Sequence, residues 1–111
     1  MKYEVVLSKH SFADLNEIFD YIAYNLQSKE NAEAQLSRLE DEIASLDRMP
    51  ERYRLYDRGP WRSRKVHILP VDNYCVLYIP NREQKTVTIL RVVYGGRNLD
   101  AILAEYEHKS D

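Results

Sequence analysis

The stretch Thr86-Val87-Thr88-Ile89-Leu90-Arg91-Val92-Val93-Tyr94 is rich in β-branched residues and is the best starting point for the fold. Such side chains suit a pleated surface, so residues 86–94 are predicted to form a long strand that Gly95-Gly96 ends. The polar residues 81–85 before it predict a turn. The almost wholly apolar and aromatic run 74–79 predicts a central strand, and 65–69 predicts another beyond a turn at 71–73.

The N-terminal half has a different pattern. Residues 3–7 predict one more strand, and apolar residues then recur at helical spacing over 12–26 and again over 32–49. Ser8 or Ser11 can cap the first helix, Ser28 or Asn31 can cap the second, and Pro50 stops the pattern. Residues 51–62, with Gly59-Pro60, have the composition of a loop, and Asn98 can cap a short final helix.

This order predicts an α+β fold in one domain spanning residues 1–111. An antiparallel helical hairpin should cover one face of a mainly antiparallel four-stranded sheet, with a short helix after it. The chain has no apolar run long enough to cross a membrane, and its start lacks the pattern of a signal peptide. Its one cysteine excludes an internal disulfide or a zinc site built from several cysteines. We expect a cytoplasmic protein that needs no metal or other cofactor.

The charge of −2 is unevenly distributed along the chain. Residues 1–51 contain eleven Asp or Glu and five Lys or Arg, whereas residues 52–97 contain three and ten. The second half is therefore basic, which indicates a surface suited to an acidic partner or a phosphate.

Four stretches together resemble the RelE/ParE toxin superfamily in order and spacing. They are Val6-Leu7-Ser8 leading into residues 14–22, residues 46–52, residues 64–78 and residues 87–98. The resemblance implies the toxin of a type II toxin–antitoxin module, as found in plasmid stabilisation systems. Such a toxin is held silent by a cognate antitoxin and meets operator DNA only through that antitoxin. The superfamily contains inhibitors of DNA gyrase and ribonucleases that cut mRNA on the ribosome.

The ribonuclease reading depends on Lys65, His67 and Arg97. Lys65 and His67 are two residues apart, so in a strand they share a face, and they lie near the lysine pair of RelE-like enzymes. Arg97 is similar to the arginine that stabilises the scissile phosphate in those metal-independent enzymes. However, Cys75 and Leu103 stand where an arginine and a tyrosine are expected, with Tyr106 a rough substitute. Alternatively, Lys65 and His67 are solvated residues on an open sheet face.

The end of the last strand favours the other branch. Tyr94-Gly95-Gly96-Arg97-Asn98 is similar to the histidine-glycine-x-arginine-aspartate run of ParE-like chains. We therefore favour gyrase inhibition over RelE-like mRNA cleavage, with a degenerate toxin that only binds its antitoxin as a third hypothesis. Candidates for contact with the target or antitoxin are Arg62, Arg64, Tyr94 and Arg97. Structural alternatives remain for each: Arg97 can cap a helix, and tyrosines can simply pack. Arg91 is expected to pair with Asp14 or Glu17, and Cys75 to be a small buried hydrophobe.

Overall fold

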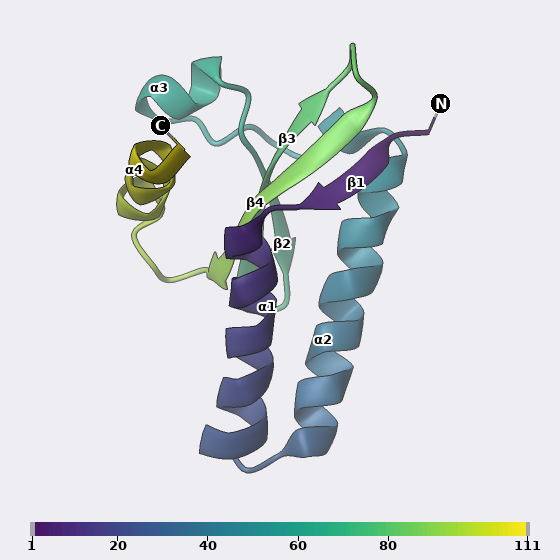
Figure 1. The fold of residues 1–111 in the computed structure, drawn as a ribbon, viewed down its shortest axis with the longest axis vertical. Coiled ribbons are helices and arrows are strands. Elements are labelled where there is room, and N and C mark those ends of the chain that lie inside the picture. Colours follow the sequence, from purple (N-terminus) through teal and green to yellow (C-terminus); the bar gives the residue numbers. More distant parts are fainter. Residues whose placement is uncertain (1, 111) are drawn as a thin grey trace.

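A computed structural model describes residues 2–110, with side chains described except at 59, 60 and 105–110. Four strands and four α-helices follow one another in the order β1, α1, α2, α3, β2, β3, β4, α4 (Figure 1). Their bounds are β1 Glu4–Leu7, α1 Lys9–Asp20, α2 Lys29–Ala44, α3 Gly59–Ser63, β2 His67–Val71, β3 Tyr74–Asn81, β4 Thr86–Tyr94 and α4 Leu99–Ser110. A π-helical segment, Tyr21–Asn25, continues α1.

The four strands form one sheet in the order β1-β4-β3-β2. β1 runs parallel to β4, and the β4–β3 and β3–β2 pairs are antiparallel. The sheet is therefore mainly antiparallel, as expected, and the α+β prediction is confirmed. The predicted central strand, β3, lies between β4 and β2.

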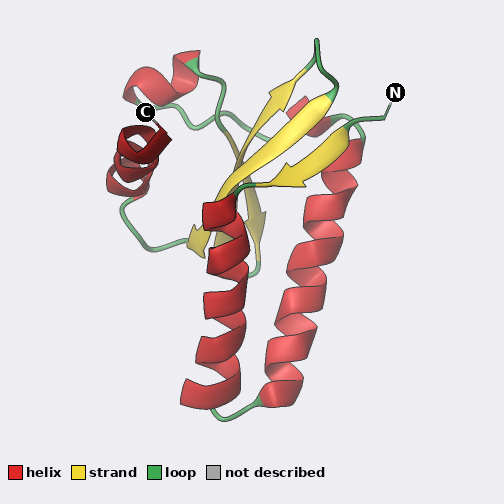
Figure 2. Cartoon of the chain, viewed as in Figure 1, coloured by secondary structure: helices red, strands yellow, loops and turns green. Residues whose placement is uncertain are grey.

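The helical hairpin of α1 and α2 covers one face of the sheet. Leu39, Ile43 and Leu46 are almost fully buried against strand residues such as Val76 and Ile89. Tyr78, also fully buried, donates its hydroxyl hydrogen bond to the Pro50 carbonyl at 2.6 Å. The hairpin is longer than this core, and its tip extends past the sheet (Figures 1 and 2).

The second face of the sheet is also covered. Trp61 of α3 and Leu103 of α4 pack with Leu77, Ile68 and Leu90 in a separate apolar cluster. Asp100 on α4 accepts a 2.8 Å hydrogen bond from the Tyr56 hydroxyl, which fastens the helix to the preceding segment. The sheet face that the sequence allowed to be open is therefore covered by these two helices.

The ends of two elements differ from the prediction. α2 stops at Ala44 and a 3₁₀ turn, Ser45–Asp47, follows, whereas helical spacing extended to Met49. Met49, directly before Pro50, has φ 45° in the left-handed region. Pro50 disfavours the right-handed helical region at this position, so the helix cannot continue through it. The predicted loop 51–62 contains a 3₁₀ turn, Pro50–Arg52, and most of α3. Ser8 and Ser28 are the N-caps, each accepting from the backbone three residues on.

Candidate functional site

The candidate site lies where β4 runs past the end of β1. β1 ends at Leu7, opposite Ile89, whereas β4 continues to Tyr94. An irregularity in the β3–β4 pairing leaves Leu90 as an extra residue, because Tyr78 pairs with Ile89 and Leu77 with Arg91. Ser8 connects this bulge to α1: its hydroxyl accepts from the Ser11 backbone at 3.1 Å and donates to the Leu90 carbonyl at 2.9 Å.

Beyond the bulge, β4 has no neighbouring strand on the β1 side, and the Asp14 carboxylate accepts a backbone hydrogen bond there. Asp14 on α1 accepts from the Val92 backbone N–H at 2.9 Å and from Nε and Nη2 of Arg91 at 2.8 and 2.9 Å. Its side chain is 8% exposed and that of Arg91 is 16% exposed. A buried backbone N–H without a partner would be costly, so Asp14 allows β4 to extend beyond β1. This confirms the expected pairing of Arg91, with Asp14 rather than Glu17 as the partner.

A groove of about 830 Å³ opens between this part of β4 and the helical hairpin. α1 and its π-helical extension form one wall, α2 forms another, and the β2–β3 turn and the end of β4 close the base. Its lining combines apolar and aromatic side chains with charged ones: Asp14, Glu17, Ile18, Tyr21, Ile22, Leu26, Asn31, Ala34, Gln35, Arg38, Asn73, Tyr74, Val92, Val93, Tyr94 and Arg97.

Tyr21, Tyr74 and Tyr94 supply the aromatic part of the groove lining. Tyr74 and Tyr94 meet edge to face with ring centroids 6.2 Å apart. Burial raises the pKa of the Tyr74 hydroxyl, and interaction with Tyr21 and Tyr94 raises it further. Tyr94 and Tyr21 are 56% and 53% exposed, so both present ring surface to solvent. Ring surface with a polar tip is typical of protein interfaces.

Arg97 joins this group through a tight turn. The backbone N–H of Arg97 donates to the Tyr94 carbonyl at 3.1 Å, and that of Gly95 donates to the Asn73 carbonyl at 2.8 Å. A Cβ at Gly96 would come within 3.1 Å of the Tyr94 ring, so a larger residue would push the ring aside. The structure therefore brings together Tyr94 and Arg97, two of the four residues expected to bind a target or antitoxin.

The other two lie on the opposite side of the sheet. Arg62 of α3 pairs with Asp57 at 2.6 Å, and the Arg64 guanidinium stacks over the Trp61 ring, 5.3 Å from its centroid. Because Trp61 packs on the face away from the hairpin, these arginines do not belong to the groove. The expected binding residues thus form two separate surfaces.

The expected strand face with Lys65 and His67 is wrong. β2 begins only at His67, and Lys65 is an exposed turn residue with φ 61°. His67 is 5% exposed, stacks on Tyr78 with centroids 5.4 Å apart, and donates from Nδ1 to the Tyr53 carbonyl at 2.7 Å. The alternative that both residues are solvated on an open sheet face is therefore wrong for His67, which is buried.

Nor does the sheet bring His67 to Arg97. His67 pairs with Tyr78, whereas Tyr94, beside Arg97, pairs with Tyr74. Four residues along β3 correspond to roughly 13 Å. Leu103 is fully buried in the apolar cluster beneath α3 and α4. Cys75 is half-buried against that cluster, and burial raises the pKa of its thiol. The side chain of Tyr106 lies outside the described residues.

Two further findings concern the described part of the chain. Within residues 2–110, no three His, Cys, Asp or Glu side chains with described positions group as metal ligands would. No helix there is long and apolar enough to cross a membrane.

Comparison with known proteins agrees with the fold. The family model described as the ParE toxin of type II toxin–antitoxin systems, parDE, matches residues 5–99. The chain therefore belongs to the ParE toxin family, within the RelE/ParE superfamily. No curated protein sequence matches it.

Solved structures share the fold at low sequence identity. The chromosomal ParDE system from P. aeruginosa gives a TM-score of 0.70 at 17% identity, covering 84% of this chain and 96% of that one. The toxin RelE from E. coli, as a double arginine-to-alanine mutant in the free state, gives 0.66 at 11% identity, with 98% of both chains covered. The RelBE2 toxin–antitoxin complex from Mycobacterium tuberculosis gives 0.60 at 22%, covering 85% and 99%.

Proposed function

We propose that this ParE-family toxin acts by binding and inhibiting DNA gyrase, until its cognate antitoxin occupies the toxin surface. The observation that carries the proposal is the separation of Lys65, His67 and Arg97 described above. Metal-independent RNA cleavage needs a base, a phosphate-stabilising cation and an acid around one phosphate. A buried His67 and a distant Arg97 do not provide that arrangement, whereas inhibition by binding needs only a contact surface.

The groove is the proposed binding site of the antitoxin. Its tyrosines offer apolar ring surface, and Arg97 adds a positive charge at its lining, whereas Arg38 there is paired with Asp72. An amphipathic segment that places apolar residues on the rings and a carboxylate against Arg97 fits this chemistry. The solved relatives include toxin–antitoxin complexes, among them RelBE2 from Mycobacterium tuberculosis.

The direct test is a gyrase supercoiling assay with purified toxin. Inhibition that rises with toxin concentration and disappears on adding the antitoxin is the expected result. The same preparations should leave mRNA on programmed ribosomes intact. Unchanged supercoiling at a large excess of toxin would rule out the proposal.

The superfamily's other activity gives the alternative outcome. A RelE-like ribonuclease would cut mRNA in the ribosomal A site, and Arg97→Ala or Lys65→Ala would each cost about 2–4 kcal/mol of transition-state stabilisation. A chain that impairs neither gyrase nor mRNA, and whose expression without antitoxin is harmless, would be a degenerate toxin that only binds its antitoxin.

A further inference from the structure

A carboxylate of the chain itself fills a polar site on the α2 wall of the groove. Nε2 of Gln35 and Nε of Arg38 both donate to the same oxygen of Asp72, Oδ2, at 2.9 and 2.7 Å. The two donors are three residues apart on α2, so they lie on one face of the helix. Both line the groove, whereas Asp72 lies outside the lining, in the two-residue turn between β2 and β3. Two side chains of the groove therefore converge on one carboxylate oxygen.

The internal contact is weak enough to be exchanged. The Arg38 and Asp72 side chains are 54% and 42% exposed, and exposed ion pairs add little to stability because water screens them. Of the guanidinium's five N–H groups, Nε binds Asp72 and Nη2 reaches Gln35 Oε1 at 3.4 Å, which leaves further donors for an incoming acceptor. Hydrogen bonds from Arg38 and Gln35 lower the pKa of Asp72, so the site favours an ionised carboxylate.

The site is joined to the aromatic part of the groove. Asn73, next to Asp72, accepts at its carbonyl from the Gly95 N–H at 2.8 Å. The turn that carries Asp72 is thus tied to the end of β4, where Tyr94 packs edge to face on Tyr74. An occupant that covers these two rings therefore also lies beside α2 and its donors.

We propose that Gln35 and Arg38 form a carboxylate-binding site for the antitoxin, and that Asp72 is the stand-in ligand of this site in the free toxin. On binding, an Asp or Glu side chain of the antitoxin takes the Arg38 guanidinium, and Asp72 turns to solvent. The inference rests on the proposed function, because it names chemistry that the groove recognises in its antitoxin. Asp72 makes the groove selective, since a segment without a matching carboxylate leaves the internal pair intact and gains nothing from Arg38.

The test measures the affinity of the full-length toxin for its full-length antitoxin by isothermal titration. Asp72→Asn keeps a residue that tolerates the left-handed backbone, φ 54°, but weakens the competition for Arg38. Affinity should therefore rise about threefold, the size expected for an exposed ion pair. A gain of this kind cannot come from misfolding. Arg38→Ala should weaken binding about fivefold, because it removes a charge-assisted hydrogen bond.

Asp72→Asn in the Arg38→Ala background separates exchange from simple repulsion. If Asp72 competes for Arg38, the gain in affinity disappears once Arg38 is absent. If Asp72 only repels an acidic antitoxin through space, the gain persists without Arg38, and the proposal is overturned. No gain from Asp72→Asn in the otherwise unchanged toxin overturns it as well.

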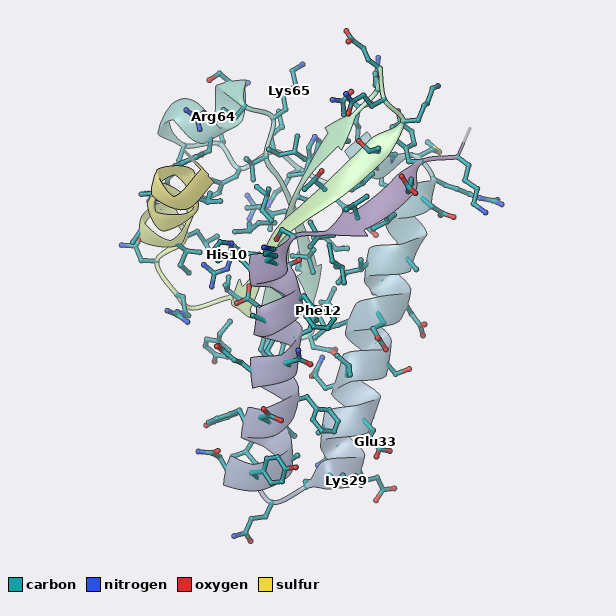
Figure 3. The ribbon with its side chains drawn as sticks, viewed as in Figure 1. His10, Phe12, Lys29, Glu33, Arg64 and Lys65 are labelled. Carbon is teal, nitrogen blue, oxygen red and sulfur yellow. The ribbon has the colours of Figure 1, made fainter. Side chains whose placement is uncertain are left out.

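Two charge-matched variants control for the net charge of the toxin. Glu33→Gln removes a carboxylate from α2 itself, near the tip of the hairpin and outside the groove lining (Figure 3). Glu51→Gln releases Arg82 from an exposed pair with the same N–O distance, 2.7 Å, also outside that lining. Each should change antitoxin affinity by less than about 1.5-fold, because salt screens distant surface charges. A gain in either control equal to that of Asp72→Asn would overturn the assignment to Arg38.

The supercoiling assay distinguishes this proposal from the proposed function. A toxin that inhibits gyrase, and whose antitoxin affinity falls on Tyr94→Ala but does not respond to Asp72→Asn, refutes the exchange alone. A toxin that leaves supercoiling intact but shows the Arg38-dependent gain refutes gyrase inhibition and keeps the exchange.

Discussion

The carboxylate of Asp14 on α1 and the guanidinium of Arg91 on β4 form a two-pronged ion pair, with N–O distances of 2.8 and 2.9 Å. The same carboxylate accepts from the Val92 backbone, so one side chain both neutralises a charge and completes the sheet. Because β1 ends before this point, α1 and β4 are held together here by Asp14. The pair therefore positions the helix that forms one wall of the groove.

Replacing Asp14 with alanine should destabilise the protein by about 3 kcal/mol. The change leaves Arg91 as a mostly buried charge without this carboxylate and removes the acceptor of the Val92 N–H. Urea unfolding followed by circular dichroism measures the loss.

The matched control is Arg38→Ala, which breaks the 2.7 Å Arg38–Asp72 pair. Both of its side chains are about half exposed, so the loss should be clearly smaller than that of Asp14→Ala. Equal losses in the two variants would show that the Asp14–Arg91 pair has no special structural role.

Ser8→Ala should cost about 1–2 kcal/mol of unfolding free energy, more than Ser28→Ala. Both serines cap helices, but only Ser8 also donates to the Leu90 carbonyl at the β4 bulge. Thermal or urea unfolding of the two variants gives the comparison. A smaller effect at Ser8 than at Ser28 would contradict the structural link between the helix cap and the bulge.

The sequence predicts the helices and strands because each has a repeating apolar pattern and recognisable end residues. Pairing Arg91 with a carboxylate was also predictable, since a charge within an apolar strand needs a partner. The turn before β2 was harder to predict from the sequence. Residues 65–69 look like a continuous strand, but a Schellman motif after α3 takes Lys65 out of it. A small error at that boundary produced the wrong face for Lys65 and His67.

The groove itself could not be predicted from the sequence. It depends on the different lengths of β1 and β4, and on a hairpin that extends past the sheet, neither of which is a local property. Tyr21 was missed for this reason. Its signal was present, since Tyr21 and Tyr24 interrupt the polar side of an otherwise amphipathic helix and are exposed in the structure.

Alkaline pH should destabilise the protein, and the buried Tyr78 hydroxyl should account for a large part of the loss. Burial raises the pKa of the Tyr78 hydroxyl above its ordinary value of 10.0. Above that pH the unfolded chain releases this proton and the folded chain keeps it, so stability is full below pH 10 and falls as pH rises. Tyr78→Phe should weaken this dependence in urea unfolding between pH 8 and 11. Some dependence should remain, since the pKa values of Tyr56 and Tyr74 are also raised. A variant that loses stability as steeply as the wild type would contradict this.

Antitoxin binding should be sensitive to the groove and insensitive to α3. Tyr94→Ala removes an exposed ring that packs on Tyr74, and it should weaken antitoxin affinity at least tenfold, about 1.4 kcal/mol. Arg97→Ala should also weaken it, with the larger loss at low salt if an acidic segment is bound. Arg62→Ala, on the far side of the sheet, should change affinity less than twofold. Isothermal titration with the full-length antitoxin measures all three. If Arg62→Ala weakened binding more than Tyr94→Ala, the antitoxin would bind at α3 and not in the groove.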